Sequence, residues 1–194
     1  VYGIVRAAEN CNGSGDCRKS EIIGGTMCPS YMATRKESTT TRARANILRE
    51  FLTQSTKKNP FDHKEIYMIM DLCLSCKGCK SECTSNVDMA KMKAEFLQHW
   101  YDAHGIPLRT YAIAYYHKIN GLFSFIPGLY NAVIKSKILS GLLKNMLGFA
   151  SGRSLPLLSR KSLRNWAKNN VPGLNSKLIN HDKKVALFID EFTN

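Results

Sequence analysis

The stretch "DLCLSCKGCKSEC", residues 71–83, places four cysteines two, two and three residues apart. On either side of it apolar residues recur at helical spacing, from Asp62 up to the stretch and from Ser85 to Gly105. Asp62 and Ser85 each stand three positions before an acidic residue, and we predict that they cap these two helices. The four thiols then lie in a loop held between two helices. Such a loop suits a metal centre, because metal ligands must be held rigidly.

The spacing of these four cysteines is that of the bacterial ferredoxin motif, which binds iron–sulfur clusters through thiolates. In that motif the first three cysteines hold one cluster and the fourth ligates a second cluster. The first cluster therefore needs a ligand from elsewhere. Cys28 precedes Pro29, in the form of a terminal ligand, and proline suits the first turn of a helix. We predict a [4Fe-4S] cluster, at a position that we call site A, on Cys28, Cys73, Cys76 and Cys79.

A second cluster, at site B, is predicted on Cys11, Cys17 and Cys83. Ser14 stands in "CNGSGDC" where the ferredoxin motif would have a middle cysteine. Site B therefore has three thiolates, and the Ser14 oxygen, solvent or another side chain can complete it. The sequence allows either a [4Fe-4S] or a [3Fe-4S] cluster at site B.

Two other uses of the cysteines compete with iron–sulfur clusters. Structural zinc is also bound by four cysteines, but commonly as two separated pairs, which the run from Cys73 to Cys83 does not resemble. Inert buried cysteines are common in proteins, but four of them do not recur at this spacing by chance. Iron–sulfur ligation is the interpretation that we carry forward.

Composition favours a folded protein in a reducing setting. The chain has 194 residues, 44% of them apolar, and its seven cysteines are an odd number, which argues against a secreted disulfide framework. We identify no secretory leader. The uncharged run at 119–134 is too short and too often interrupted to span a bilayer. We expect a cytoplasmic location, with a peripheral position at the inner face of the membrane as an addition to it.

Positive charge is concentrated in the second half of the chain. The formal net charge is +13 overall, and between Asp102 and Asp182 no acidic residue occurs. No nucleic-acid motif accompanies this charge, so we predict no nucleic-acid partner. We expect a packing platform for neighbouring domains, with docking to an anionic membrane surface as the alternative. Within the first half, Arg42, Arg44 and Arg49 are predicted to be ordinary surface charges of a helix, the alternative being a place beside a cluster.

The remaining pattern predicts a mainly α protein. Residues 1–37 look irregular, and 38–52 form a helix with hydroxyl residues as caps. Broken amphipathic helices are predicted over 106–150, interrupted at Pro127–Gly128, and a short helix over 162–168. The apolar run 185–189 reads as the first strand of a truncated domain. The predicted domains are an α-helical ferredoxin-type domain at 1–105, a basic helical segment at 106–182, and the start of a cysteine-rich domain at 183–194.

Two longer stretches carry a family resemblance. "CNGSGDCRK…GGTMCPSYMATRKE…TTRARANILREFL" and "DLCLSCKGCKSECTSNVDMAKMKAEFL" resemble the iron–sulfur region of FAD-linked oxidoreductases of the D-lactate and D-2-hydroxyglutarate dehydrogenase type. They are also similar to the iron–sulfur subunits of glycolate oxidase and anaerobic glycerol-3-phosphate dehydrogenase. Thr84 departs from the pattern, since many relatives have proline there. The ligands that the resemblance implies are Cys11, Cys17, Cys28, Cys73, Cys76, Cys79 and Cys83.

The resemblance also implies partners and a function. It implies an upstream flavin domain that binds FAD and lies outside these residues, and a downstream cysteine-rich domain. Electrons would pass from reduced flavin through the clusters to a quinone or protein acceptor, so the chain would be the electron-transfer portion of an enzyme. The alternative functions are a redox-sensing or interaction module, in which the cluster is regulatory or structural, and a standalone ferredoxin-like subunit.

Overall fold

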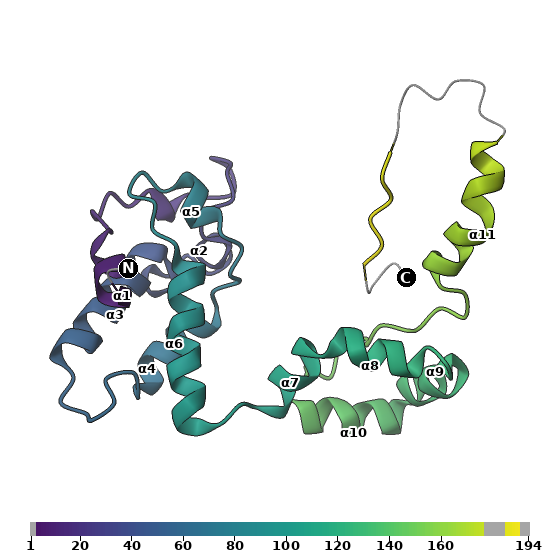
Figure 1. Ribbon diagram of the computed structural model, residues 1–194. Helices are drawn as coiled ribbons and strands as arrows, with labels where there is room; N and C mark the ends of the chain where they lie inside the picture. Colours follow the sequence, from purple (N-terminus) through teal and green to yellow (C-terminus); the bar gives the residue numbers. More distant parts are fainter. Residues whose placement is uncertain (1–2, 177–184, 191–194) are drawn as a thin grey trace. The chain divides into compact units, whose positions relative to one another are not determined.

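The computed structural model describes residues 3–176 and 185–190 (Figure 1). The chain divides into two compact units, Val1–Gly105 and Ile106–Asn194, which we call unit 1 and unit 2. The helices of unit 1 are α1 (Gly3–Glu9), α2 (Pro29–Thr34), α3 (Thr41–Gln54), α4 (Lys64–Asp71), α5 (Gly78–Glu82) and α6 (Met89–His104), with short 3-10 turns at Asp16–Arg18 and Glu37–Thr39. The helices of unit 2 are α7 (Leu108–Ala114), α8 (Tyr116–Phe123), α9 (Pro127–Lys135), α10 (Lys137–Leu147) and α11 (Leu163–Asn175). The predicted mainly α class is confirmed.

The predicted strand at 185–189 is wrong. Residues 185–190 form no regular element, and no other described residue is in a strand. A strand needs a neighbour to pair its backbone N–H and C=O groups, so an apolar run alone does not make one. The side chains of Val185 and Phe188 are exposed accordingly. The predicted start of a third domain at residue 183 lies outside the described residues.

The core of unit 1 lies between α3, α4 and α6, which pack on one another. Each of these helices presents the apolar stripe that its spacing predicts, and side chains from all three are buried. Burying one such side chain stabilises the fold by about 1.5–3 kcal/mol. The most deeply buried apolar members of the three stripes are Ala45, Leu48, Ile66, Met70, Met89, Met92 and Phe96.

The start of the chain is more regular than its sequence indicates. Residues 1–37, predicted to be irregular, contain α1 and α2. Helix α1 packs on α3 and buries Ala8, but it has too few turns for a periodic pattern to be visible. Helix α2 begins at Pro29, at the helix start expected after Cys28.

The helix caps confirm one prediction and correct two. Thr40 caps α3 by accepting the N–H of Ala43, as the hydroxyl residues there predict. Asp62 is not a cap, because α4 starts at Lys64; its carboxylate lies 2.8 Å from His104 Nε2 instead. Ser85 is not a cap either. A turn intervenes between Ser85 and α6, so Asp88 takes that place.

Unit 2 is a set of short helices in which α7 packs on α8 and α10, and α9 packs on α10. A break interrupts the helices as predicted, but it lies at residues 124–126 and not at Pro127–Gly128, because proline suits the first turn of a helix and these two residues begin α9. Helix α11 continues beyond the predicted end at residue 168 and contains Pro172. Proline interrupts helical hydrogen bonding without ending this helix.

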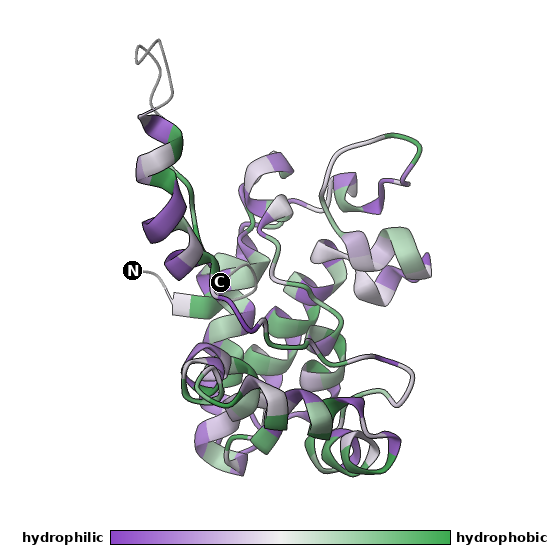
Figure 2. Cartoon of the chain, turned by 90° about the vertical axis from the view of Figure 1, so that its right-hand side faces the viewer, coloured by the Kyte–Doolittle hydropathy of each residue, from purple (hydrophilic) through white to green (hydrophobic). Residues whose placement is uncertain are grey.

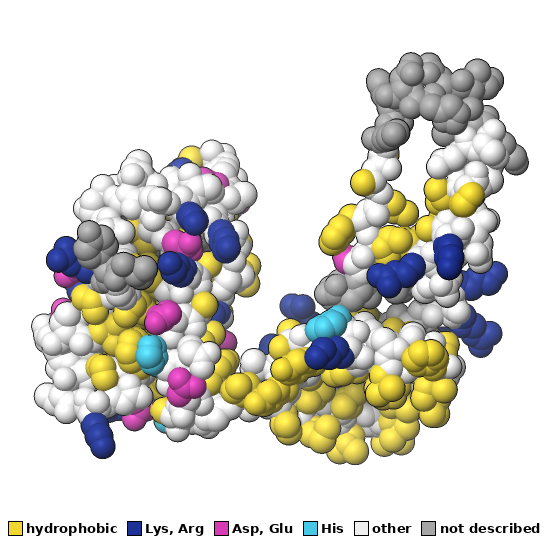
Figure 3. All heavy atoms as spheres, in the orientation of Figure 1, with side chains coloured by type: hydrophobic (Ala, Val, Ile, Leu, Met, Phe, Trp, Pro, Cys, Tyr) yellow, Lys and Arg dark blue, Asp and Glu magenta, His cyan; other side chains and the backbone are white. Residues whose placement is uncertain are grey.

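The apolar side chains of unit 2 are largely exposed. Hydrophobic and hydrophilic residues interleave along its helices (Figure 2), and hydrophobic side chains gather over the face where α10 lies (Figure 3). The buried side chains in the described part of unit 2 are polar, Asn120 and Ser140, whereas Phe125 and Ile138 are exposed. Large exposed apolar patches mark interaction surfaces. Among the described residues, no helix combines the length and the apolar character that crossing a bilayer requires.

Candidate metal centres

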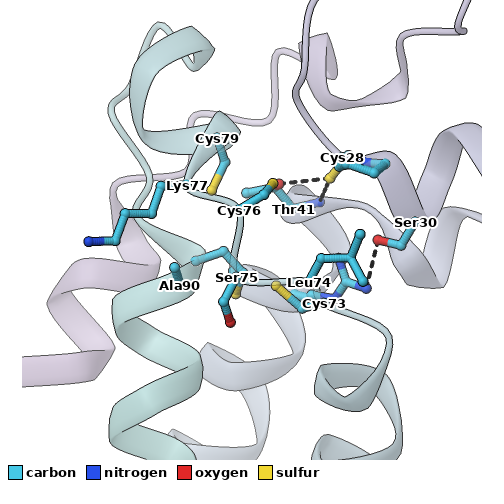
Figure 4. Close-up of a pocket in the computed structure, with 13 residues that line it drawn as sticks. Cys28, Ser30, Thr41, Cys73, Leu74, Ser75, Cys76, Lys77, Cys79 and Ala90 are labelled. Carbon is cyan, nitrogen blue, oxygen red and sulfur yellow. Dashed lines mark hydrogen bonds between the residues drawn. The ribbon is translucent and has the colours of Figure 1, made fainter. Parts of the chain in front are cut away.

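Site A is a pocket into which the four predicted cysteines converge (Figure 4). Cys28 immediately precedes α2, Cys73 and Cys76 come from the loop after α4, and Cys79 lies in α5. Cys28 and Cys79 are buried, whereas Cys76 is exposed at the mouth of the pocket. The structure thus brings together residues far apart in the chain that the motif spacing had grouped.

Left-handed backbone turns shape the wall of site A. Cys28, Ser75 and Lys77 have positive φ values of 58°, 54° and 61°. Such a conformation costs a non-glycine residue about 1–2 kcal/mol. Strain of this kind persists where the surroundings or the function require it. Here it curls the chain around the pocket, so that cysteines two residues apart face the same space.

Two cations stand at site A. The guanidinium of Arg44 is buried, with the residue only 1% exposed, and it donates to Ile69 O and Ser30 Oγ at 3.0 Å each. It forms no salt bridge with any described carboxylate. Lys93 Nζ donates to the carbonyl oxygen of Cys73 at 2.6 Å. A buried cation favours a nearby counter-charge, and cysteines of this pocket that are deprotonated by a bound metal would supply one.

Burial disfavours the charged form of the two buried thiols of site A, Cys28 and Cys79. Burial raises the pKa of the Cys28 thiol, although hydrogen bonds from Thr41 act in the opposite direction. Burial also raises the pKa of the Cys79 thiol. A coordinated metal reverses this preference, because it deprotonates its thiol ligands. The donor set, the buried cation and the pocket therefore fit an anionic, thiolate-ligated group.

Site B is a second pocket, and the remaining predicted cysteines line it. Cys11 follows α1, Cys17 lies in the turn at Asp16–Arg18, and Cys83 follows α5. Ser14 lines the same pocket, where its hydroxyl donates to Asp16 Oδ2 at 3.2 Å. All seven cysteines are thus divided between the two pockets as predicted, while the ligation itself stays a prediction.

Glu82 joins the two cysteine-bearing segments. Its carboxylate accepts hydrogen bonds from the N–H and the hydroxyl of Thr26 and from the N–H of Met27. These bonds hold the pKa of the Glu82 carboxyl below its ordinary value. Glu82 stands directly before Cys83, and Met27 directly before Cys28. These hydrogen bonds therefore fix the Cys28 segment against α5, at whose ends lie Cys79 of site A and Cys83 of site B.

The thiols of each site surround a space and not a point. Among the described residues, no group of three or more His, Cys, Asp or Glu side chains is drawn together closely enough to hold a single metal ion. Tetrahedral zinc would require four sulfur atoms at about 2.3 Å from one centre. The iron–sulfur interpretation is preferred to zinc because the spacing from Cys73 to Cys83 is that of the ferredoxin motif.

Sequence reasoning misplaced two arginines of α3. Arg44 is buried at site A, and Arg42 lines site B, so the prediction of surface charge is wrong for both, while Arg49 is exposed as predicted. The signal was present, because Arg44 lies three residues after Thr41 and four before Leu48, on the buried stripe of α3. Thr41 and Glu82 were not singled out at all. Their roles depend on contacts between distant segments.

Comparison with known proteins defines the class of unit 1. Residues 10–88 match the family model of the 4Fe-4S dicluster domain. This range includes all seven cysteines that line the two pockets. Residues 10–88 are thus a 4Fe-4S dicluster domain, a domain class that holds iron–sulfur clusters.

Similarity to individual proteins extends over most of the chain. The chain is similar to D-2-hydroxyglutarate dehydrogenase of Pseudomonas putida, with 30% identity over 82% of this chain and 19% of that protein. It is also similar to the D-2-hydroxyglutarate dehydrogenases of Pantoea ananatis, with 25% identity over 97% of this chain and 22% of that protein, and of Escherichia coli, with 24% over 91% and 19%. The chain therefore spans about a fifth of the length of the curated relatives that it matches. No solved structure matches it.

Proposed function

We propose that unit 1 relays electrons through two iron–sulfur clusters, as the electron-transfer portion of an FAD-linked 2-hydroxyacid dehydrogenase. The observation that carries this proposal is the division of seven cysteines into two pockets that share a wall. Cys79 and Cys83, at either end of one turn of helix, face different pockets, and Thr41 lines both. Adjacent sites of this kind suit the passage of electrons from one to the other.

The clusters would supply the chemistry, which is the acceptance and release of single electrons. The protein supplies thiolate ligands, a partly buried setting and local charge. Arg44 and Lys93 bring positive charge to site A, and the guanidinium of Arg42 donates to Gly13 O beside site B. Such charges and hydrogen bonds set reduction potentials.

Site A, with four thiols, is proposed to hold a [4Fe-4S] cluster. Site B has three thiols and holds either a [4Fe-4S] cluster with a further ligand or a [3Fe-4S] cluster.

The substrate chemistry is proposed by similarity. Relatives of this chain are named D-2-hydroxyglutarate dehydrogenases. We propose that a flavin domain carrying FAD oxidises a D-2-hydroxyacid and passes electrons to unit 1, which delivers them to a quinone or an electron-carrier protein. The neighbouring cysteine-rich domain is proposed as a further partner.

Unit 2 is proposed to be the platform on which the neighbouring domains pack. Its exposed apolar side chains, among them Leu122, Phe125, Ile138 and Leu142, support this role. Membrane docking is the competing role, favoured by the absence of acidic residues between Asp102 and Asp182. Sedimentation of the chain with vesicles containing anionic lipid, at low and high salt, distinguishes them. If unit 2 is a packing platform, the chain should not bind the vesicles. Binding that requires anionic lipid and weakens at high salt would establish the membrane role.

The test of the proposed relay is the iron and acid-labile sulfide content of anaerobically purified protein, with its electron paramagnetic resonance spectrum. Two [4Fe-4S] clusters give about eight irons per chain, and a [4Fe-4S] with a [3Fe-4S] cluster gives about seven. Either result supports two clusters, and reversible reduction supports the relay. Zinc without sulfide would overturn the proposal.

A further inference from the structure

Thr41 is in contact with both candidate centres. It is the first residue of α3, is 4% exposed, and lines the pockets of site A and site B alike. Among the residues that the structure describes, no other lines both of these pockets. Thr41 therefore lies at the boundary between the two sites.

The contacts of Thr41 are with a sulfur atom. Its backbone N–H donates to Cys28 Sγ at 3.0 Å, and its Oγ1 lies 2.9 Å from the same sulfur (Figure 4). When Cys28 is a thiolate ligand, its sulfur has no proton to give, so the hydroxyl of Thr41 must be the donor. One residue then donates two hydrogen bonds to one ligand of site A.

The next residue, Arg42, connects the same end of α3 with site B. The N–H of Arg42 donates to Cys17 Sγ at 3.4 Å. The first amides of an α-helix have no partner within the helix. The side chain of Thr40 accepts the N–H of Ala43. The N–H groups of Thr41 and Arg42 instead donate to the sulfur atoms of Cys28 and Cys17. The start of α3 is thus divided between the two sites.

We propose that Thr41 is a positioning residue that sets the reduction potential of the cluster at site A and fixes that cluster relative to site B. This inference rests on the proposed function. A reduced cluster carries one more negative charge than an oxidised one, so hydrogen bonds donated to its sulfur ligands stabilise the reduced form and raise the potential. The hydroxyl of Thr41 acts on site A alone, whereas the backbone of the same helical turn contacts both sites.

The experiment is a redox titration followed by electron paramagnetic resonance on the full chain, loaded anaerobically with iron and sulfide. Thr41→Val keeps the side-chain volume and the backbone N–H but removes the hydroxyl. We expect the potential of site A to fall by about 59 mV, which is a tenfold change in a one-electron equilibrium, with a smaller change at site B. The signal of site A is assigned by its loss in Cys76→Ala.

Matched variants distinguish the effect of the Thr41 hydroxyl on the potential from the effects of packing and of hydroxyl loss elsewhere. Thr41→Ser keeps the donor and should keep the potential of site A. Thr53→Val, in the same helix, removes a hydroxyl that donates to Arg49 O and should change neither potential. If Thr41→Val does not load with iron, the comparison of Thr41→Ser with Thr41→Ala replaces it, and only Ala should lower the potential.

The outcomes distinguish this inference from the function on which it rests. A wild-type chain that takes up no iron and sulfide overturns both. A loaded Thr41→Val variant with wild-type potentials overturns the role of Thr41 and leaves the two-cluster relay intact. Equal shifts in Thr41→Ser and Thr41→Val would also overturn it, since the cause would then be packing and not the hydrogen bond.

Discussion

Gly78 occupies a position in which even a methyl group has no room. It is the first residue of α5, between Cys76 and Cys79, and it is buried. A Cβ placed on Gly78 would lie 2.8 Å from the carbonyl oxygen of Thr26 and 3.0 Å from its carbonyl carbon. Thr26 cannot withdraw, because Glu82 holds its N–H and its hydroxyl. Gly78→Ala should therefore push α5 away from the segment that leads to Cys28.

The size of the effect follows from two opposing terms. Overpacking of a close contact costs about 1–3 kcal/mol. Alanine is favoured over glycine within a helix by about 0.5–1 kcal/mol. We expect a net loss of about 1–2 kcal/mol from the free energy of unfolding. In a unit of this size, each kcal/mol lowers the melting temperature by roughly 4–8 °C.

The assay is thermal unfolding followed by circular dichroism, together with iron bound per chain after desalting. Gly78→Ala should melt earlier and retain less iron than the wild type, because the displaced α5 carries ligands of both sites. Gly121→Ala is the control, since a Cβ on Gly121 in α8 meets nothing within 4 Å. If Gly78→Ala melted and bound iron like the wild type, the close contact with Thr26 would not constrain the fold and the reasoning would fail.

Three further predictions address the sites and the core. Ser14→Ala should leave the iron content unchanged. The Ser14 hydroxyl donates to the Asp16 carboxylate, and this negative charge opposes the loss of the hydroxyl proton that ligation to iron requires. A loss of one iron per chain would instead make Ser14 a ligand. Arg44→Met should lower the reduction potential of site A, measured by redox titration, whereas Arg44→Lys should keep the potential closer to that of the wild type. The same Met variant should destabilise unit 1 by about 3–6 kcal/mol in denaturant unfolding, because two hydrogen bonds from a charged donor are lost. Acid should remove one small stabilising contribution. The hydrogen bond from His104 holds the pKa of the Asp62 carboxyl below its ordinary value, so this contribution is present above the unfolded-state pKa and is lost as pH falls through the folded-state pKa; Asp62→Asn should flatten that part of the stability curve.

The helices that form the core of unit 1 could be predicted from the sequence, because each buries a stripe with clear spacing. Leu48, Ile66 and Phe96 all lie where the pattern places them. The division of the cysteines between two pockets also followed from spacing, since tight motifs restrict which sulfur atoms can face one another. Helix α1 is too short to show a period, and it was missed.

The parts that escaped prediction depend on long-range contacts. Arg44 is charged, and a charged residue on a helix is ordinarily at the surface; only the pocket beside it explains its burial. Asp88 replaced Ser85 as the cap of α6 because a turn intervenes, in which Asn86 has a positive φ of 51°. The roles of Thr41 and Glu82 involve segments that are distant in sequence, and no local pattern encodes such contacts.

The proposed ligands of both sites come from the same two segments of the chain, residues 11–28 and 73–83. During synthesis the first three cysteines leave the ribosome well before the last four. Neither centre can then be completed early, and three thiols must wait unligated, open to oxidation, until residue 83 has emerged. Each proposed cluster would also close the long loop between the segments, so its insertion would restrict the unfolded chain much as a cross-link does. We therefore expect maturation of this domain to be an all-or-none event late in biogenesis, and its cofactor supply to limit how much folded protein accumulates.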